Sequence, residues 1–294
     1  MPSLQQLTQY FITGVTNGSV YALIALGFVT IFTVTEVINF AQGEFVMLGS
    51  MLTISIMRVG LPLPVAAALG ILLVALLSGA FYWTSLRTAR RASLISLLVI
   101  TIGASIVIRG VSLIIWGTEP YTLAPFTAGA PLTVFSAIMR LQSVWVLVTT
   151  VIVLAATGYF FNRSRTGQAM RAVAMNRQAA EIFGIVPSHM AFLAFVIAGA
   201  IAAIAGVVIA PLSFATYDMG LAMGLKGFAA AAVGGLTNPA IAVMGGLLLG
   251  ILEAFGAGLL PSGYKDGIAV GILLAVLIYQ GLRHRGQFWA VAER

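Results

Sequence analysis

The chain of 294 residues is 60% hydrophobic and 8% charged, and its mean hydropathy is +1.06. Soluble domains carry about 25% charged residues, so this composition excludes an ordinary soluble domain and is typical of a protein that lies in lipid. The net charge of +7 comes from basic residues that punctuate apolar segments instead of forming a patch, so we expect no nucleic-acid partner.

The apolar segments predict a bundle of transmembrane helices, because a span needs about 20 mainly apolar residues. In chain order the expected segments are Tyr10–Val34, Glu36–Met57, Pro62–Leu86, Ser93–Trp116, Ser143–Asn162, His189–Pro211, Leu225–Leu236, Ile241–Leu260 and Asp266–Leu282. The seventh is too short to cross upright, so we expect a re-entrant, tilted or broken helix there. The sequence therefore predicts an all-α integral membrane protein, a polytopic helical bundle of eight or nine transmembrane segments that forms one domain over residues 1–294.

Basic residues predict the orientation of this bundle. Ten Lys or Arg lie in the turn Arg87–Arg91, in the polar segment 163–187 and in the tail after Leu282, whereas the opposite side holds three. Because cytoplasmic loops carry the excess of basic residues, we expect these three segments and the C-terminus in the cytoplasm. Residues 117–142, with three prolines, then form the longest outer, periplasmic loop.

The polar segment, RSRTGQAMRAVAMNRQAAEIFGI from Arg163, predicts two short helices. Asn176 is placed to cap the second helix, and Gly184 suits the residue just past its end. An apolar stripe recurs at helical spacing, with Arg171 and Arg177 off it; it consists of Ala169, Ala172, Val173, Ala180 and Phe183. Either a partner protein uses this stripe, or the segment is an ordinary basic loop that fixes the topology.

Ionisable residues inside the spans are costly in lipid and indicate functional or structural contacts. Arg109 and Glu253 lie at comparable depth, so we expect them to pair, either as a structural ion pair or as a substrate contact. Glu44, near the cytoplasmic end of its span, is expected to satisfy broken backbone where a helix begins, or to act in passage. The candidates for the translocation path or its gating are Asn39, Gln42, Glu44, Lys226, Asn238 and Glu253.

Small residues gather near the C-terminal end, in GGLTNPAIAVMGGLLLG. Paired glycines lie on both sides of an Asn238–Pro239 break, and they permit either close helix packing or relative movement of helices.

The sequence lacks the motifs that several kinds of catalysis and metal binding require. The chain has no GxxxxGK[ST] loop, so we expect any ATP hydrolysis in a partner, and it has neither HExxH nor GxSxG with a suitable His and Asp. Cysteine is absent and the two histidines, His189 and His284, lie far apart, so we expect no metal or other cofactor. These patterns favour a transport protein over an enzyme, with an ion-gradient-driven transporter as one alternative.

Three blocks of the sequence resemble one family. They are GSVYALIALGFVTIFTVTEVINFAQGEFVMLGS from Gly18, SRTGQAMRAVAMNRQAAEIFGI from Ser164, and GLKGFAAAAVGGLTNPAIAVMGGLLLGILEAF from Gly224. They are similar, in this order, to permease subunits of bacterial ABC importers for branched-chain amino acids, of the H type. Gln42 stands where many members carry His, and relatives also carry urea, short amides or aromatic acids.

The resemblance implies the function and the partners. It implies an inner-membrane permease that works by alternating access with a second homologous permease, two cytoplasmic ATPases and a periplasmic solute-binding protein. The binding protein would dock on residues 117–142 and 216–220. The resemblance also implies that the polar segment is the surface that couples to the ATPases, with Gly167, Ala169, Met170, Arg171, Ala172, Asn176, Ala180 and Gly184 as its candidate residues.

Overall fold

The computed structural model describes residues 3–89, 92–134 and 137–259, together with Gly267, Gly271, Ala275 and Ile278. Its helices are α1 (Leu4–Thr35), α2 (Gln42–Arg58), α3 (Leu63–Phe81) continued by a π-helix (Tyr82–Leu86), α4 (Leu94–Trp116), α5 (Leu141–Arg163), α6 (Arg165–Met175), α7 (Arg177–Ile182), α8 (Pro187–Ile209), α9 (Met219–Val233) and α10 (Pro239–Leu259). The expected all-α polytopic membrane fold is confirmed. The last predicted span, Asp266–Leu282, lies outside the described residues except for the four named above.

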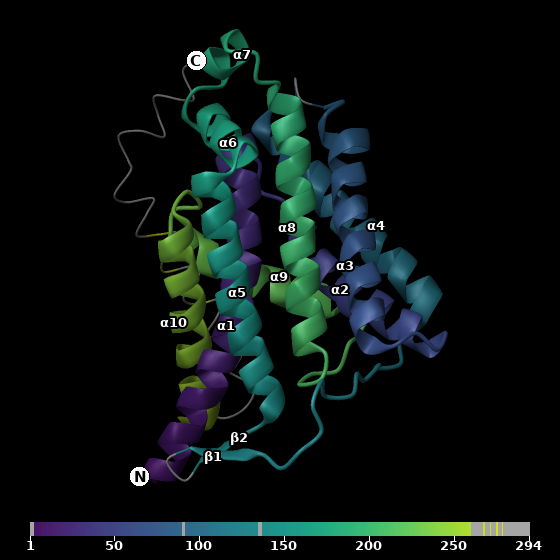
Figure 1. Ribbon diagram of the computed structural model, residues 1–294, viewed down its shortest axis with the longest axis vertical. Coiled ribbons are helices and arrows are strands. Elements are labelled where there is room, and N and C mark those ends of the chain that lie inside the picture. Colours follow the sequence, from purple (N-terminus) through teal and green to yellow (C-terminus); the bar gives the residue numbers. More distant parts are fainter. Residues whose placement is uncertain are drawn as a thin grey trace.

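Six helices of the described part are long and apolar enough to cross a membrane: α1, α3 with its π-helical end, α4, α5, α8 and α10. They run along the long axis of the molecule, with α6 and α7 at one end and the N-terminus at the other (Figure 1). A short antiparallel hairpin of β1 (Leu132–Val134) and β2 (Ala137–Met139), which the sequence analysis did not predict, lies at the N-terminal end.

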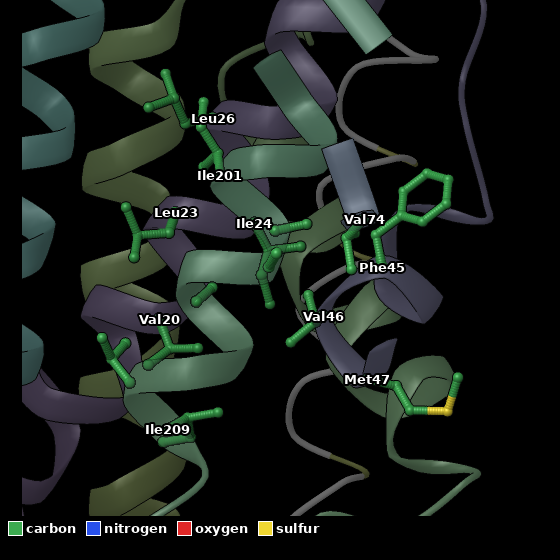
Figure 2. Packing of buried hydrophobic residues seen from close by; sticks show 14 of the residues in the cluster. Val20, Leu23, Ile24, Leu26, Phe45, Val46, Met47, Val74, Ile201 and Ile209 are labelled. Carbon is green, nitrogen blue, oxygen red and sulfur yellow. The ribbon is translucent and has the colours of Figure 1, made fainter. Parts of the chain in front are cut away.

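Helix α1 forms the centre of the bundle, and every residue from Gly18 to Ile31 is buried. Figure 2 shows the apolar packing around it, with Val20, Leu23, Ile24 and Leu26 of α1 near Phe45, Val46 and Met47 of α2, Val74 of α3, and Ile201 and Ile209 of α8. Lipid is as apolar as these side chains, so close van der Waals packing holds the helices together.

Glycines let α10 pack directly on α1. A methyl group at Gly18 would lie 2.8 Å from the Cα of Leu247, and one at Gly246 would lie 2.6 Å from the Cα of Ala22. Distances under 3.0 Å leave no room for a side chain, so the two backbones are in contact. The glycine-rich block therefore serves close packing in this structure.

Helix α2 begins inside the bundle and not at its surface. Residues 36–41 are non-helical, and Glu36 ends α1 in the left-handed conformation with φ 58°. They bring the Nε2 of Gln42 to 3.0 Å from the carbonyl oxygen of Ala198, which lies midway along α8. Glu44, predicted near the cytoplasmic end of its span, therefore lies at mid-depth of the bundle.

The short apolar run is also longer than predicted, because α9 begins at Met219 rather than at Leu225. A tight turn with Gly235 and Leu236 at positive φ separates it from α10. The Oδ1 of Asn238 accepts hydrogen bonds from the backbone N–H groups of Ala240 and Ile241, so the Asn–Pro pair starts a new helix.

Candidate translocation site

A buried ion pair joins α9 to α10 next to α1. The Nζ of Lys226 donates to Oε1 of Glu253 at 2.9 Å, and the Tyr21 hydroxyl donates to Oε2 of the same carboxylate at 2.7 Å. Glu253 is 1% exposed and Lys226 is 9% exposed. Both carboxylate oxygens thus receive a charge-assisted or hydroxyl hydrogen bond, which offsets part of the cost of burying the charge.

A cavity of about 590 Å³ lies beside this pair. Seven of its lining residues come from α1, at positions 9, 12, 13, 16, 17, 20 and 21, which is one helical face. At 1.5 Å per residue, this face extends for about 18 Å along α1. Arg140 and Gln9 line the cavity near the β1–β2 hairpin, and Lys226 and Tyr21 line it further along α1.

A second buried ion pair joins α2 to α4. The Nη2 of Arg109 donates to Oε1 of Glu44 at 2.8 Å, and the Ser105 hydroxyl donates to the same oxygen, also at 2.8 Å. The side chain of Glu44 is 1% exposed and that of Arg109 is 24% exposed.

The predicted pair of Arg109 and Glu253 is therefore wrong, because each residue is bonded to a different partner. Equal depth along two spans does not make those spans neighbours. The mid-bundle start of α2 brings Glu44 to α4, and α9 brings Lys226 to α10, so both charges are matched locally.

A backbone N–H group at the break before α2 is hydrogen-bonded by the side chain of Asn39 and not by that of Glu44, contrary to the prediction. The Oδ1 of Asn39 accepts from the N–H of Ala41 at 3.1 Å, whereas the Glu44 carboxylate bonds only side chains in the hydrogen bonds of the described part. Asn39, Gln42 and Glu44 are buried but are not among the described residues that line the cavity. Their part in passage stays a prediction, as does that of Asn238, which caps α10.

The polar segment forms the two predicted helices, α6 and α7. The Ser164 side chain caps α6, and the Oδ1 of Asn176 caps α7 by accepting from the N–H of Ala179 at 2.9 Å. Gly184 follows α7 with φ 80°, so the predicted cap and helix end are confirmed.

The apolar stripe on these helices faces mainly inward. Val173 and Ala180 are buried, with Met170, in an apolar cluster that also contains Ile31 and Val34 of α1 and Phe195 of α8, so they are not open to a partner. Of the predicted stripe, only Phe183 is widely exposed, and it is joined at the tip by two residues that the sequence analysis did not single out. The exposed apolar tip is Met175, Ile182 and Phe183, which are 88%, 85% and 84% exposed.

The remaining candidates of this segment support its shape. Gly167 packs on α5, where a methyl group would lie 2.7 Å from the Cα of Phe161. Arg171 is exposed and donates to the Oδ1 of Asn162 at 3.0 Å, and Ala169 and Ala172 are half-buried. None of these contacts by itself shows a partner.

Sequence reasoning also missed Tyr21 and Arg140. Tyr21 stands inside the apolar run VYALIAL, and only its spacing of four from Asn17 on one helical face marks it. Arg140 was counted only as a basic residue of the outer side, although it sits at the N-terminus of α5 and lines the cavity.

These features define a class of protein: a polytopic helical membrane protein whose charged side chains gather beside a polar cavity, as membrane transport proteins have. Comparison with known proteins agrees with this class. Residues 10–277 match the family described as branched-chain amino acid transport system / permease component.

Individual relatives match over almost the full chain. The high-affinity branched-chain amino acid transport system permease protein BraD of Pseudomonas aeruginosa is 30% identical over 95% of this chain and 96% of its own length. The corresponding LivH protein of Escherichia coli is 32% identical over 92% of both chains. The autoinducer 2 import system permease protein LsrC of Escherichia coli is 28% identical over 95% of this chain and 80% of its own. The chain belongs to the branched-chain amino acid transport permease family.

Proposed function

We propose that the chain is the transmembrane permease subunit of an ATP-driven importer for branched-chain or other hydrophobic amino acids. The observation that carries this proposal is the match to BraD and LivH over more than nine-tenths of every chain. The chain contains no phosphate-cradling sequence motif, so the energy comes from separate ATPase subunits. It is a multi-pass membrane protein, and we place it in the bacterial inner membrane with its C-terminus in the cytoplasm.

The partners follow from the permease assignment. They are a second homologous permease, two cytoplasmic ATPases and a periplasmic solute-binding protein. Tyr121 and Ala215 exchange backbone hydrogen bonds of 2.9 Å, which ties residues 117–142 to the segment before α9. This continuous outer surface suits the docking of the binding protein.

Helices α6 and α7 suit the docking of an ATPase. Their inner residues pack on α1, and their tip presents Met175, Ile182 and Phe183 at the end of the molecule opposite the N-terminus (Figure 1). Approach of the two ATPases on ATP binding would rock the bundles as rigid bodies and alternate access to the path.

The overall proposal is tested with purified components in liposomes. We expect uptake of leucine to require ATP, the ATPases, the second permease and the loaded binding protein. Competition by leucine, phenylalanine, urea and glutamate identifies the substrate class. Uptake by this chain alone, driven by a proton or sodium gradient, would contradict the proposal in favour of a secondary transporter.

The ATPase contact is tested at the exposed tip. The double substitution Ile182→Ser and Phe183→Ser removes two large apolar contacts without touching the buried base of α6, so we expect uptake to fall at least about tenfold while the complex stays folded. The single substitution Arg171→Glu would act in the same direction. The matched control is Thr88→Ala, an exposed change in the other basic turn, which should keep uptake within about twofold. Normal uptake by the double variant would show that the tip is not the docking surface.

A further inference from the structure

The described lining of the cavity beside Lys226 contains basic side chains, which can bind a carboxylate. Among its described lining residues are two cations, Lys226 and Arg140, and no acidic side chain. Lys226 is a lining residue, whereas Glu253, its partner in the ion pair, is not among the described residues of the wall.

The two cations lie at different depths. Arg140 precedes the first residue of α5 and directly follows the hairpin. At the hairpin, the side-chain amide of Gln9 donates to the backbone carbonyl of Ile138 and accepts from its backbone N–H. Lys226 lies beside Tyr21, which is about 18 Å further along α1 from Gln9. Each end of this stretch of the cavity wall therefore carries a basic residue.

The walls between the cations combine polar and aliphatic side chains. Thr13, Asn17 and Ser213 supply hydroxyl and amide groups, whereas Val20 and Leu212 supply apolar surface. The volume of about 590 Å³ corresponds to on the order of 20 water molecules at liquid density, which is room for an amino acid with its hydration.

Glu253 fixes where the ammonium group stands. Its carboxylate accepts from Tyr21 on one oxygen and bonds Lys226 on the other, so the Nζ cannot move away without breaking a buried ion pair.

We propose that this cavity seats the amino acid during passage, with the substrate carboxylate on the Lys226 ammonium and the aliphatic side chain against Val20 and Leu212. Arg140 attracts the carboxylate at the outer mouth, and Glu253 is a positioning residue that does not touch the substrate. This inference rests on the proposed importer function and names the group that recognises its substrate.

The test uses the complete importer in liposomes and measures leucine uptake per ATP hydrolysed. Lys226→Met alone leaves Glu253 buried without its cation, so the double variant Lys226→Met with Glu253→Gln is used to remove both charges and keep the packing. We expect this double variant to lose uptake about tenfold or more, while its ATP hydrolysis still responds to the loaded binding protein within about twofold. Lys226→Arg keeps the cation and should retain uptake within about threefold.

The control variant is Arg87→Met, which removes a cation that stacks on Trp83 far along the chain from the cavity, and it should keep uptake within about twofold. Uptake by the double variant at the wild-type level would overturn the proposed substrate site in the cavity and leave the importer function intact. A wild-type complex without ATP-dependent uptake would overturn both the importer function and the proposed substrate site.

A second measurement does not depend on the ion-pair variants being active. A photoreactive leucine analogue, irradiated with the wild-type complex during turnover, should label peptides of α1 and α9 that line the cavity. Excess leucine should suppress this label. Labelling confined to other helices would overturn the proposal.

Discussion

The two buried ion pairs have the same chemistry but different surroundings. Glu253 has a hydrogen-bond donor on each carboxylate oxygen, and its cation lines a cavity. Glu44 receives both of its donors on one oxygen, and its Oε2 has no hydrogen-bond partner among the described residues. The Nε of Arg109 likewise has none there.

Helix α9 lies between the two pairs. Lys226 reaches Glu253 on the side of α1 and α10, whereas Gly220 packs against the Glu44 carboxylate on the side of α2. The comparison teaches that a charged pair in lipid does not indicate a single function. Lys226 lines the cavity, which suits a ligand contact, and the Glu44 pair holds the mid-bundle start of α2 against α4.

The largest expected effect follows from removing Glu253. Glu253→Ala leaves Lys226 without its buried carboxylate, so we expect the free energy of unfolding to fall by about 3–5 kcal/mol, measured by denaturant titration in detergent micelles. Glu44→Ala should cost less, because the Arg109 side chain is 24% exposed and also donates to the Ser105 hydroxyl. If Glu44→Ala lowered the free energy of unfolding as much as Glu253→Ala or more, the proposed difference between the two ion pairs would be contradicted.

An intermediate effect is expected at Gly220. A methyl group there would overlap the Glu44 carboxylate, so Gly220→Ala should lower the free energy of unfolding by about 2 kcal/mol. Gly110→Ala on α4 is the matched control, because a methyl group there meets nothing within 4 Å and alanine favours the helix by roughly 0.5–1 kcal/mol. The same assay should show opposite signs for the two substitutions, and equal signs would argue against the tight contact.

The smallest effect is expected for Tyr21→Phe. It removes the hydroxyl donor to Glu253 and keeps the ring, so we expect a loss of about 1 kcal/mol, as for hydrogen bonds between membrane helices. Thermal unfolding of the purified protein in detergent measures this change. Thr150→Val removes a hydroxyl that bonds only its own helix backbone at 2.8 Å and serves as the control. A loss for Tyr21→Phe no greater than for Thr150→Val would mean that the hydroxyl contributes nothing specific to the pair.

Local features of the fold were predictable from the sequence because they depend on nearby residues. Apolar length marked the long spans, and Asn176 and Gly184 marked the ends of α7 through their backbone preferences. The resemblance to a permease family, carried by three sequence blocks, was confirmed by the match over residues 10–277.

Lateral contacts were not predictable in the same way. Depth along a span suggested Arg109 with Glu253, but which helices are neighbours depends on the mid-bundle start of α2 and on the placement of α9. The buried side of α6 was missed for a similar reason, since an apolar stripe looks alike whether it packs on α1 or on a partner. The cavity needed five separate elements to be placed before it could be seen.

The length of α1 has a mechanical consequence. Its 32 residues contain no proline and extend for about 48 Å, more than the roughly 30 Å thickness of the hydrocarbon layer. One end contacts the base of α6 through Ile31 and Val34, and the other carries the wall of the cavity from Gln9 to Tyr21. A stiff rod of this kind would act as a lever, so a tilt imposed by α6 at one end would swing the cavity wall at the other without any relay of side chains between them.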